Sequence, residues 1–252
     1  MDKTLLKGLQ VLEALARSSR PRGVSDLAKE LDLARSNMHR TLRTLVEAGL
    51  VAQDEASGHY ACTLKLFELG SAIPIRSDIA GIADPIMLAL SDATNETVHL
   101  SALEGGDVVY LHKIDSTHPV RAYTKVGGRA PAYCVATGKA LLAWQPDSYL
   151  DRYEGTLNPF TEATLADLGA LRGELEEVRR QGFALNRGEW RDSVCGVAAP
   201  VFGIGGRPVA AIGLSGPSSR LPADRLDDFA RQITAAARDL THKMGCKFST
   251  PE

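Results

Sequence analysis

The chain has 252 residues, of which 44% are hydrophobic and 24% are charged, a composition typical of a soluble globular protein of one or two domains. Its four cysteines are scattered without a CxxC pair, which argues against a zinc site or a disulfide framework and suits a reducing cytoplasm. No apolar stretch approaches the roughly 18 residues that a membrane span needs, and no signal peptide is evident. We therefore expect a cytoplasmic protein without membrane contact, metal or cofactor.

Charge is distributed unevenly along the chain. Residues 1–50 hold nine Lys/Arg against six Asp/Glu, whereas the remaining residues hold 20 against 25, and the whole chain has a net charge of −2. A basic region attracts the phosphate backbone of nucleic acid, and an acidic region is repelled by it. The N-terminal part is therefore the part that we expect to contact nucleic acid.

Two helices are predicted at the N-terminus. Apolar residues at three- to four-residue spacing predict a helix over residues 4–17 with one buried face, formed by Leu5, Leu9, Leu12 and Leu15/Ala16. Pro21 and Gly23 then interrupt the chain. Ser25 is the expected N-cap of the second helix, because its hydroxyl accepts a free backbone N–H of the first turn. The inner face of this helix is expected to hold Leu27, Ala28 and Leu31.

A third helix is predicted over residues 35–48, after a turn at 32–34 and before Gly49, a residue type that commonly follows helices. Its apolar side chains, which we expect to face the first two helices, are Met38, Leu42, Leu45 and Val46. Two short helices joined by a tight turn, with polar groups at the start of the second, are typical of a helix-turn-helix that enters the DNA major groove. We expect DNA contacts from Arg35, Ser36, Asn37, His39, Arg40 and Arg43.

These six residues are assigned different roles. Arg35, Ser36 and Asn37 begin the helix and are expected to reach base edges, whereas Arg40 and Arg43 are expected to hold phosphates. A hairpin follows, because alternating segments at 51–53 and 60–64 flank a turn signal at 55–58. The helix-turn-helix is therefore predicted to be winged, with His59 and the backbone N–H groups of Ser57 and Gly58 near the DNA backbone. We place this domain at residues 1–64.

The rest of the chain is predicted to be a second domain of mixed helices and strands. A short helix over 64–73 ends at Pro74, and a longer one runs from about 79 to 92 with an apolar face of Ile82, Ile86, Leu88 and Leu90. A hairpin turns at 104–107, helices follow at 136–144 and 165–181, strands at 197–202 and 208–215, and a last helix at 223–243. The fold class is therefore α+β with two domains. We assign residues 65–83 to a linker helix and residues 84–249 to the second domain.

The chain resembles the IclR-type bacterial transcriptional regulators over nearly its full length. The matching segments are LLKGLQVLEALA, LAKELDLARSNMHRTLRTLVEAGLV, LKLFELG, GRAPAYCVATGKALLA, RRQGFALNRGEW, GVAAPVF and AAIGLSGPSSRL, in the family's order. The resemblance implies an N-terminal winged helix-turn-helix, a linker helix and a C-terminal GAF-like effector-binding domain. It also implies a homodimer, often paired into a tetramer, on a palindromic site in double-stranded promoter DNA. The expected function is a ligand-responsive regulator of a catabolic operon, a repressor rather than an activator.

The resemblance also implies where the effector binds. In this family small carboxylates are held near an Asp, a Cys and a pair of serines, and the corresponding positions here are Asn186, Gly196, Gly213 and Ser215, with a cysteine displaced to 195. We therefore expect a roomier pocket for a larger organic acid, such as an aromatic one. The expected effector-binding residues are Tyr133, Cys134, Thr137, Asn186, Cys195, Gly196 and Ser215. Further candidates are Tyr123 and Trp190 for the lining, and Arg121, Arg129 and Arg187 for the carboxylate.

Catalytic motifs are weaker in this sequence. GIGGRP at 203–208 has Pro where a dinucleotide-binding loop needs its last Gly, and GLSGP at 213–217 has Pro where a nucleophile elbow needs Gly. Cys134 or Cys195 with His99 or His112 is the remaining nucleophile candidate, but a single cysteine in an apolar strand is more often a buried small side chain. The alternative function is a metabolite-binding protein, or a cysteine or serine hydrolase, whose N-terminal helices only dimerise.

Overall fold

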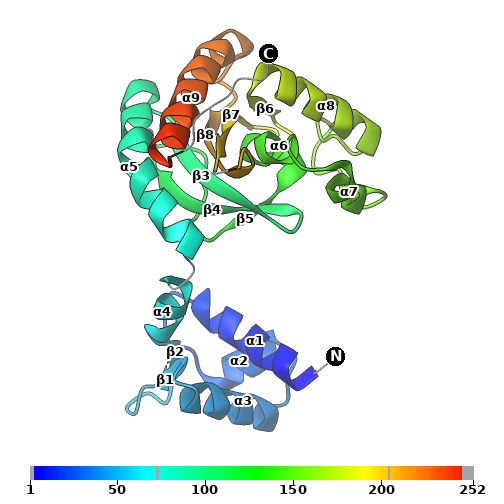
Figure 1. Ribbon diagram of the computed structural model, residues 1–252. Coiled ribbons are helices and arrows are strands. Elements are labelled where there is room, and N and C mark those ends of the chain that lie inside the picture. The colour runs from blue at the N-terminus through cyan, green and yellow to red at the C-terminus, as the bar shows by residue number, and fades with distance from the viewer. Residues whose placement is uncertain (1–2, 72–73, 204, 246–252) are drawn as a thin grey trace. The chain divides into compact units, whose positions relative to one another are not determined.

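The computed structural model describes residues 3–71, 74–203 and 205–245, and the chain divides between residues 74 and 75 into two compact units (Figure 1). Within these residues, none of the helices is long and apolar enough to cross a membrane. The elements of the N-terminal unit are α1 (Lys3–Ala16), α2 (Val24–Glu30), α3 (Arg35–Glu47), β1 (Val51–Gln53), β2 (Tyr60–Cys62) and α4 (Lys65–Ser71).

The core of the N-terminal unit forms where α1, α2 and α3 meet the hairpin. Its buried side chains include Val11, Leu15, Leu27, Met38, Leu42, Leu45, Val51 and Tyr60. The turn between α2 and α3 contains Asp32 at a φ of 50°, a left-handed conformation that Asp tolerates better than most residues. The predicted helix-turn-helix is confirmed, because α3 packs against α2 through its apolar stripe after this tight turn.

Three predictions about the N-terminal helices are wrong. The second helix begins at Val24 after Gly23, and no side chain caps it, so Ser25 lies within its first turn. Val46 is exposed, because the inner stripe of α3 is complete with residues 38, 42 and 45. Leu5 and Leu9 are 63% and 52% exposed, whereas Leu15 is buried as predicted, together with Val11.

The hairpin β1–β2 is antiparallel, with Val51 opposite Cys62 and Gln53 opposite Tyr60. Arg22 forms an isolated bridge to Tyr60, which attaches the segment before α2 to the hairpin. Leu64 lies beyond the end of β2 and is exposed. The predicted wing is present, with strands of three residues each.

The larger unit is built on one antiparallel sheet with the strand order β5-β4-β3-β8-β7-β6. Its strands are β3 (Thr97–Glu104), β4 (Asp107–Ile114), β5 (Arg129–Pro131), β6 (Ala184–Arg187), β7 (Val194–Phe202) and β8 (Pro208–Pro217). The predicted hairpins β3–β4 and β7–β8 are confirmed, and β3 pairs with β8 at the centre of the sheet. The short strands β5 and β6, which sequence patterns did not indicate, form the two edges.

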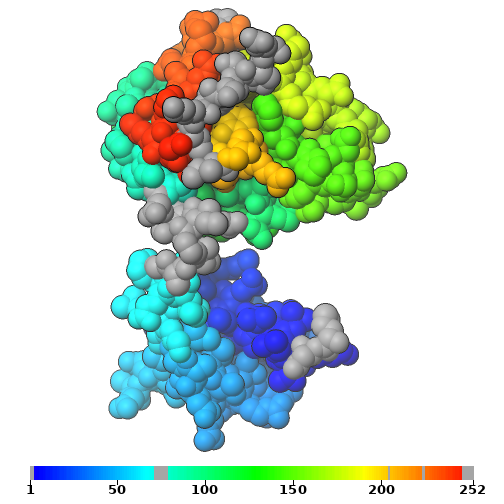
Figure 2. Space-filling model, viewed as in Figure 1, coloured from blue at the N-terminus to red at the C-terminus, as the bar shows by residue number. Residues whose placement is uncertain are grey.

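Helices cover both faces of this sheet. On one face α5 (Pro74–Thr94) and α9 (Ala223–Lys243) pack on an apolar layer that includes Met87, Ile212 and Ile233. Figure 2 shows the two helices side by side on the surface of this unit. On the other face lie α6 (Ala136–Leu142) and α8 (Leu168–Gln181). Leu88, predicted to lie on the inner face of α5, is 44% exposed.

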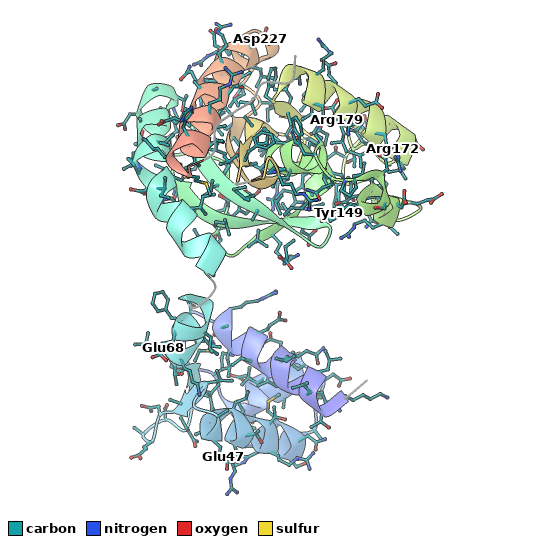
Figure 3. The ribbon with its side chains drawn as sticks, in the orientation of Figure 1. Glu47, Glu68, Tyr149, Arg172, Arg179 and Asp227 are labelled. Carbon is teal, nitrogen blue, oxygen red and sulfur yellow. The ribbon has the colours of Figure 1, made fainter. Side chains whose placement is uncertain are left out.

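Irregular structure connects α6 to α8. It contains the helical turn α7 (Asp147–Leu150), which a short 3₁₀ turn (Asp151–Tyr153) follows directly. Arg172 of α8 reaches toward α7 (Figure 3) and pairs with Asp147 at 3.0 Å and Asp151 at 2.9 Å. The range 65–83, which we assigned to a linker helix, contains α4 and the first part of α5, and residues 72–73 lie outside the described residues. The predicted α+β fold is confirmed for this unit.

Candidate DNA-binding helix and ligand pocket

Helix α3 presents all six predicted DNA-contacting side chains to solvent: Arg35, Ser36, Asn37, His39, Arg40 and Arg43 are exposed. In the described part of the chain, none of the three arginines forms an ion pair. Since 3.6 residues complete one helical turn, each residue is rotated by about 100° from the last. Ser36, Arg40 and Arg43 therefore lie opposite the buried stripe, Arg35 and His39 flank one side, and Asn37 flanks the other. The face is basic and free to meet a polyanion.

The turn of the wing between β1 and β2 has fewer free backbone N–H donors for DNA than its sequence suggested. Asp54 accepts hydrogen bonds from the backbone N–H and the hydroxyl of Ser57, at 2.7 and 2.6 Å, and these bonds lower the pKa of its carboxyl. The N–H of Gly58 donates to the carbonyl of Asp54 at 2.8 Å. The two N–H groups expected near phosphates are thus used inside the turn. The His59 ring lies against the carbonyl of Ser57, with Nδ1 2.9 Å from the oxygen.

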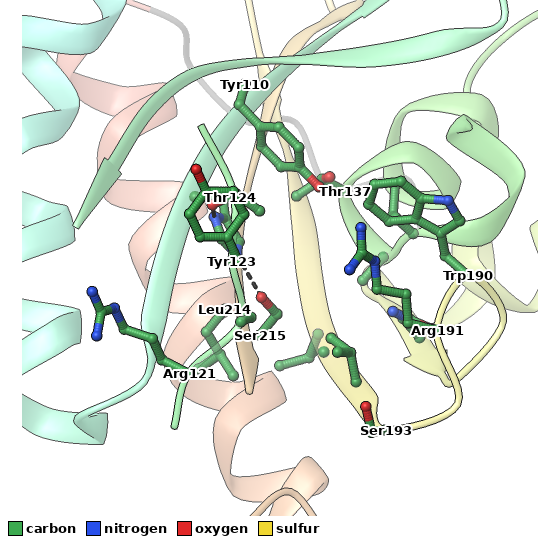
Figure 4. A pocket seen from close by; sticks show the side chains of 18 residues that line it. Tyr110, Arg121, Tyr123, Thr124, Thr137, Trp190, Arg191, Ser193, Leu214 and Ser215 are labelled. Carbon is green, nitrogen blue, oxygen red and sulfur yellow. Dashed lines mark hydrogen bonds between the residues drawn. The ribbon is translucent and has the colours of Figure 1, made fainter. Parts of the chain in front are cut away.

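A pocket of about 230 Å³ lies in the larger unit, between the α6 face of the sheet, the segment 121–124 and the loop 188–193, hereafter the pocket loop (Figure 4). Its lining includes both aromatic and polar side chains: His99, Tyr110, Arg121, Tyr123, Thr124, Thr137, Asn186, Trp190, Arg191, Ser193 and Ser215. This combination of apolar walls with a few placed polar groups is typical of a small-molecule site.

His99 and Ser215 form a polar pair at the pocket. The Nε2 atom of His99 is 2.5 Å from the hydroxyl of Ser215, and Nδ1 is 3.3 Å from the hydroxyl of Thr124. Burial, and then the charge of Lys113, lower the pKa of His99 to about 4, so the ring is neutral at physiological pH. Its neighbour Tyr110 stays protonated, because burial raises its pKa to about 12. The pair therefore offers neutral hydrogen-bonding groups, and among the described residues the ring nitrogens contact hydroxyls rather than the carboxylate that orients the imidazole of a catalytic triad.

Asn186 has two separate tasks. Its Oδ1 accepts the backbone N–H groups of Gly188 and Glu189 at 3.0 and 3.1 Å, which starts the pocket loop. These two donors fix the orientation of the amide, because only the oxygen can accept them. The NH₂ group of Asn186 has no hydrogen bond within the described residues. Since this residue lines the pocket, its NH₂ group is left as a donor for a bound molecule.

The glycines at 196 and 213 do not enlarge the pocket in the way that we expected. A Cβ at Gly213 would lie 2.7 Å from the Cβ of Ala198 and 3.0 Å from a methyl of Thr137, so this space is already occupied. A Cβ at Gly196 would lie 2.7 Å from the carbonyl oxygen of Leu214. The two glycines allow close approach of neighbouring segments. They do not add volume to the pocket.

Four of the predicted effector-binding residues meet at the pocket: Thr137, Asn186, Gly196 and Ser215. Tyr133 and Cys134 lie in the apolar layer beneath α6, where Tyr133 packs edge-on against Tyr153. Cys195 packs toward the opposite face of the sheet, because side chains alternate along β7 and Gly196 takes the pocket side. The structure therefore does not bring these three residues to the pocket.

The arginine candidates are also separated. Arg121 lines the pocket, whereas Arg129 pairs with Asp107 at 3.0 Å, away from it. Arg187 is outside the lining, and Arg191 takes its place, with its guanidinium 5.0 Å from the centre of the Trp190 ring. Tyr123 and Trp190 line the pocket as expected.

Sequence reasoning missed His99, Tyr110, Arg191 and Ser193 as pocket residues. For His99 a signal was present, since a histidine within an apolar strand needs a buried hydrogen-bond partner. The nucleophile candidates gain no support, because burial raises the pKa of the Cys134 thiol to about 12, and the side-chain partners of His99 and His112 in the described part of the chain are Ser215, Thr124 and Asp84 rather than a cysteine. The described residues contain no group of three His, Cys, Asp or Glu side chains arranged to hold a metal ion.

A winged helix-turn-helix in one unit and a polar-lined pocket in the other define a DNA-binding regulator that responds to a small molecule. The family model described as "Bacterial transcriptional regulator IclR C-terminal" matches residues 74–242, and that of the "IclR helix-turn-helix domain" matches residues 4–55. The chain therefore belongs to the IclR family of bacterial transcriptional regulators, which are not enzymes.

Relatives support this assignment over the whole chain. The chain is 36% identical to the HTH-type transcriptional regulator KdgR of Escherichia coli (strain K12), an alignment that covers 96% of this chain and 92% of that protein. It is 30% identical to the transcriptional repressor IclR of the same organism, covering 96% and 90%. An IclR homolog from Microbacterium hydrocarbonoxydans, crystallised with 4-hydroxybenzoate, shares the fold with a TM-score of 0.84 at 22% identity, covering 97% of this chain and 100% of that one.

Proposed function

We propose that this regulator is a repressor of a catabolic operon and that a small organic acid, aromatic or similarly bulky, relieves repression by binding in the pocket. The observation that carries this proposal is the composition of the pocket: aromatic walls with two arginines and the free NH₂ group of Asn186. The repressor role is supported by the name of the IclR relative. Since its target is promoter DNA, the protein is proposed to act in the cytoplasm.

The carboxylate of the effector has suitable donors in the pocket. Arg191 forms no ion pair within the described residues, and Arg121 is only loosely paired, 3.8 Å from Asp115. Guanidinium groups bind carboxylates through two parallel N–H donors, which favours an acid over a neutral molecule of the same shape. The body of the effector would lie against Tyr110 and Trp190, where an aromatic ring gains by stacking. The Microbacterium homolog, which was crystallised with an aromatic acid, fits the same picture.

DNA is proposed to bind along α3, with Arg35, Ser36 and Asn37 at base edges and Arg40 and Arg43 at phosphates. A palindromic operator requires two recognition helices, and we propose that a homodimer supplies them. Exposed apolar side chains on α1 and α4 provide a surface that a second copy would cover: Leu5, Leu6, Leu9, Phe67 and Leu69. Exposed apolar side chains of this number are typical of association surfaces. Two dimers would pair to form the tetramer.

A thermal-shift series tests the effector class. Benzoate and 4-hydroxybenzoate are compared with the neutral benzamide at equal concentration, for the wild type and the variants Arg191→Met and Arg129→Met. A ligand at about 100 times its Kd stabilises a protein by roughly 2.7 kcal/mol, which raises the melting temperature by several degrees. We expect stabilisation by an acid, none by benzamide, and loss of the effect in Arg191→Met only. Equal effects of acid and amide, or equal loss in both variants, would contradict the proposal.

A further inference from the structure

The most buried charge in the larger unit lies outside the pocket, directly behind its wall. The side chain of Lys139, on α6, is fully buried, and its ammonium donates to Oε1 of Glu189 at 2.7 Å and to Oε1 of Glu174 at 2.9 Å. The side chain of Glu189 is 6% exposed, whereas that of Glu174 is 23% exposed. An ammonium is removed from water at a high cost unless ionised partners surround it, so this lysine depends on both carboxylates.

The three charges join separate segments of the chain. Lys139 follows Thr137 on α6, Glu174 belongs to α8, and Glu189 belongs to the pocket loop. Thr137 lines one side of the pocket, and the residues after Glu189, Trp190 and Arg191, line another. The bond between Lys139 and Glu189 therefore spans two walls of the same cavity.

Every polar group of Glu189 takes part in a hydrogen bond. Its Oε2 accepts the backbone N–H of Arg187 at 3.1 Å, and its carbonyl accepts the hydroxyl of Thr164 at 2.6 Å. Its own N–H donates to Asn186, as described above. A residue that is fixed through its carboxylate, its carbonyl and its N–H also fixes the path of the next residues. These are Trp190 and Arg191, whose side chains line the pocket.

We infer that Glu189, anchored by Lys139, is a positioning residue for effector binding, because it holds the pocket loop in the conformation that places Trp190 and Arg191 against the pocket. This inference rests on the proposed function only for the identity of the pocket as the effector site. A cluster that only stabilised the fold would make a different prediction for its two carboxylates. Glu174 and Glu189 would then be equivalent, since both neutralise the same ammonium.

The two carboxylates supply matched variants. In Glu174→Gln the amide oxygen still accepts from Lys139, and the pocket loop keeps all of its bonds. In Glu189→Gln, with the amide oxygen on Lys139, the NH₂ group faces the N–H of Arg187, and two donors oppose each other. Both variants remove one charge from the cluster, but only the second disturbs the loop.

The experiment uses the full chain without any ligand, in a Trp144→Phe background that leaves Trp190 as the fluorescent reporter. Acrylamide quenching of Trp190 and amide hydrogen exchange of residues 188–193 are measured together with the melting temperature. Both variants are expected to have a lower melting temperature than the wild type. For Glu189→Gln we expect about a twofold larger quenching constant and roughly tenfold faster exchange in the loop, as for a local opening, and for Glu174→Gln neither change.

Equal effects of the two variants on the loop, or no effect of Glu189→Gln, would overturn the inference. If Glu189→Gln does not fold, Glu189→Asp replaces it, because the shorter carboxylate keeps the charge but does not span the distance to both Lys139 and the N–H of Arg187. A loop as protected as in the wild type in that variant would contradict the inference as well. Since no effector is used, these outcomes are independent of whether the organic-acid proposal holds.

Discussion

The proposed binding of an acidic effector can be tested at Asn186. In Asn186→Asp the retained Oδ1 still accepts the two backbone N–H groups, so the pocket loop keeps its anchor. The NH₂ donor becomes a second carboxylate oxygen. The resemblance places such an oxygen near small carboxylates, but it repels a larger acid whose own carboxylate accepts from the Asn186 amide. Since a hydrogen bond to a charged group contributes about 1.5–3 kcal/mol, we expect affinity for the acid to fall by roughly 10- to 100-fold.

Isothermal titration with the best acid from the thermal-shift series measures this change. The melting temperature of the ligand-free Asn186→Asp variant should remain close to that of the wild type, which separates the effect from a loss of structure. Asn186→Ala serves as the contrasting variant, because it also removes the acceptor and should lower the melting temperature. An unchanged acid affinity in Asn186→Asp would show that the amide does not face the effector.

His99 makes the stability of the larger unit depend on pH. Its pKa is about 4 in the folded chain, below the 6.5 of an unperturbed histidine, so between these values the unfolded chain takes up a proton that the folded chain does not. Stability therefore falls as the pH falls through this window, by about 2 kcal/mol between pH 7 and pH 5. Urea unfolding at the two pH values should show this loss in the wild type and a smaller loss in His99→Gln. Equal losses would mean that the ring titrates normally.

At the level of single residues, family motifs located the pocket better than chemical reasoning did. Asn186, Gly196 and Ser215 were found from motif positions. Cys195 was included because a cysteine next to the expected position is attractive, yet the alternation of β7 turns it to the other face. Arg191 and Tyr110 reach the pocket only through the three-dimensional arrangement of a loop and a hairpin, which no local pattern contains.

Among the elements, α3 carries the main prediction about DNA. Asn37→Ala should lower the affinity for the operator by about 1–3 kcal/mol and relax the sequence preference, because a base contact is lost. Arg40→Ala should weaken binding to operator and random DNA alike and reduce the salt dependence by about one counterion, because a phosphate contact is lost. Fluorescence anisotropy with both DNAs at several salt concentrations measures these effects. Similar changes in both variants would remove the distinction between base and phosphate contacts.

Long helices were predictable and short edge strands were not. The predicted boundaries of α9 match the structure, and those of α1 and α3 agree to within one residue, because each has a continuous apolar stripe. The helix predicted over 79–92 is longer than expected, since α5 already begins at Pro74, the residue that we expected to end the preceding helix. The strands β5 and β6 have three and four residues, too few to show an alternating pattern, and pairing with β4 and β7 defines them. Exposed Leu5, Leu9 and Leu88 show that periodicity identifies an apolar face but not the partner that covers it.

At the level of the whole molecule, the uneven charge along the chain follows the two structural units. The basic N-terminal segment folds into the helix-turn-helix, and the acidic remainder forms the unit that contains the pocket. An effector changes DNA binding only if it binds with different affinity to the states that do and do not bind DNA. In the proposed homodimer, the exposed apolar residues of α1 and α4 would lie at the contact with the second copy.

The proposed function is tested by the affinity of the full chain for the DNA upstream of its own gene, with and without the acid that stabilises the protein most. We expect tight binding at low salt and an affinity roughly 5- to 150-fold weaker with saturating acid in the wild type, since typical couplings are about 1–3 kcal/mol. In Asn186→Asp the same concentration of acid should have little effect. A Kd for DNA that the acid leaves unchanged in the wild type would contradict the central claim.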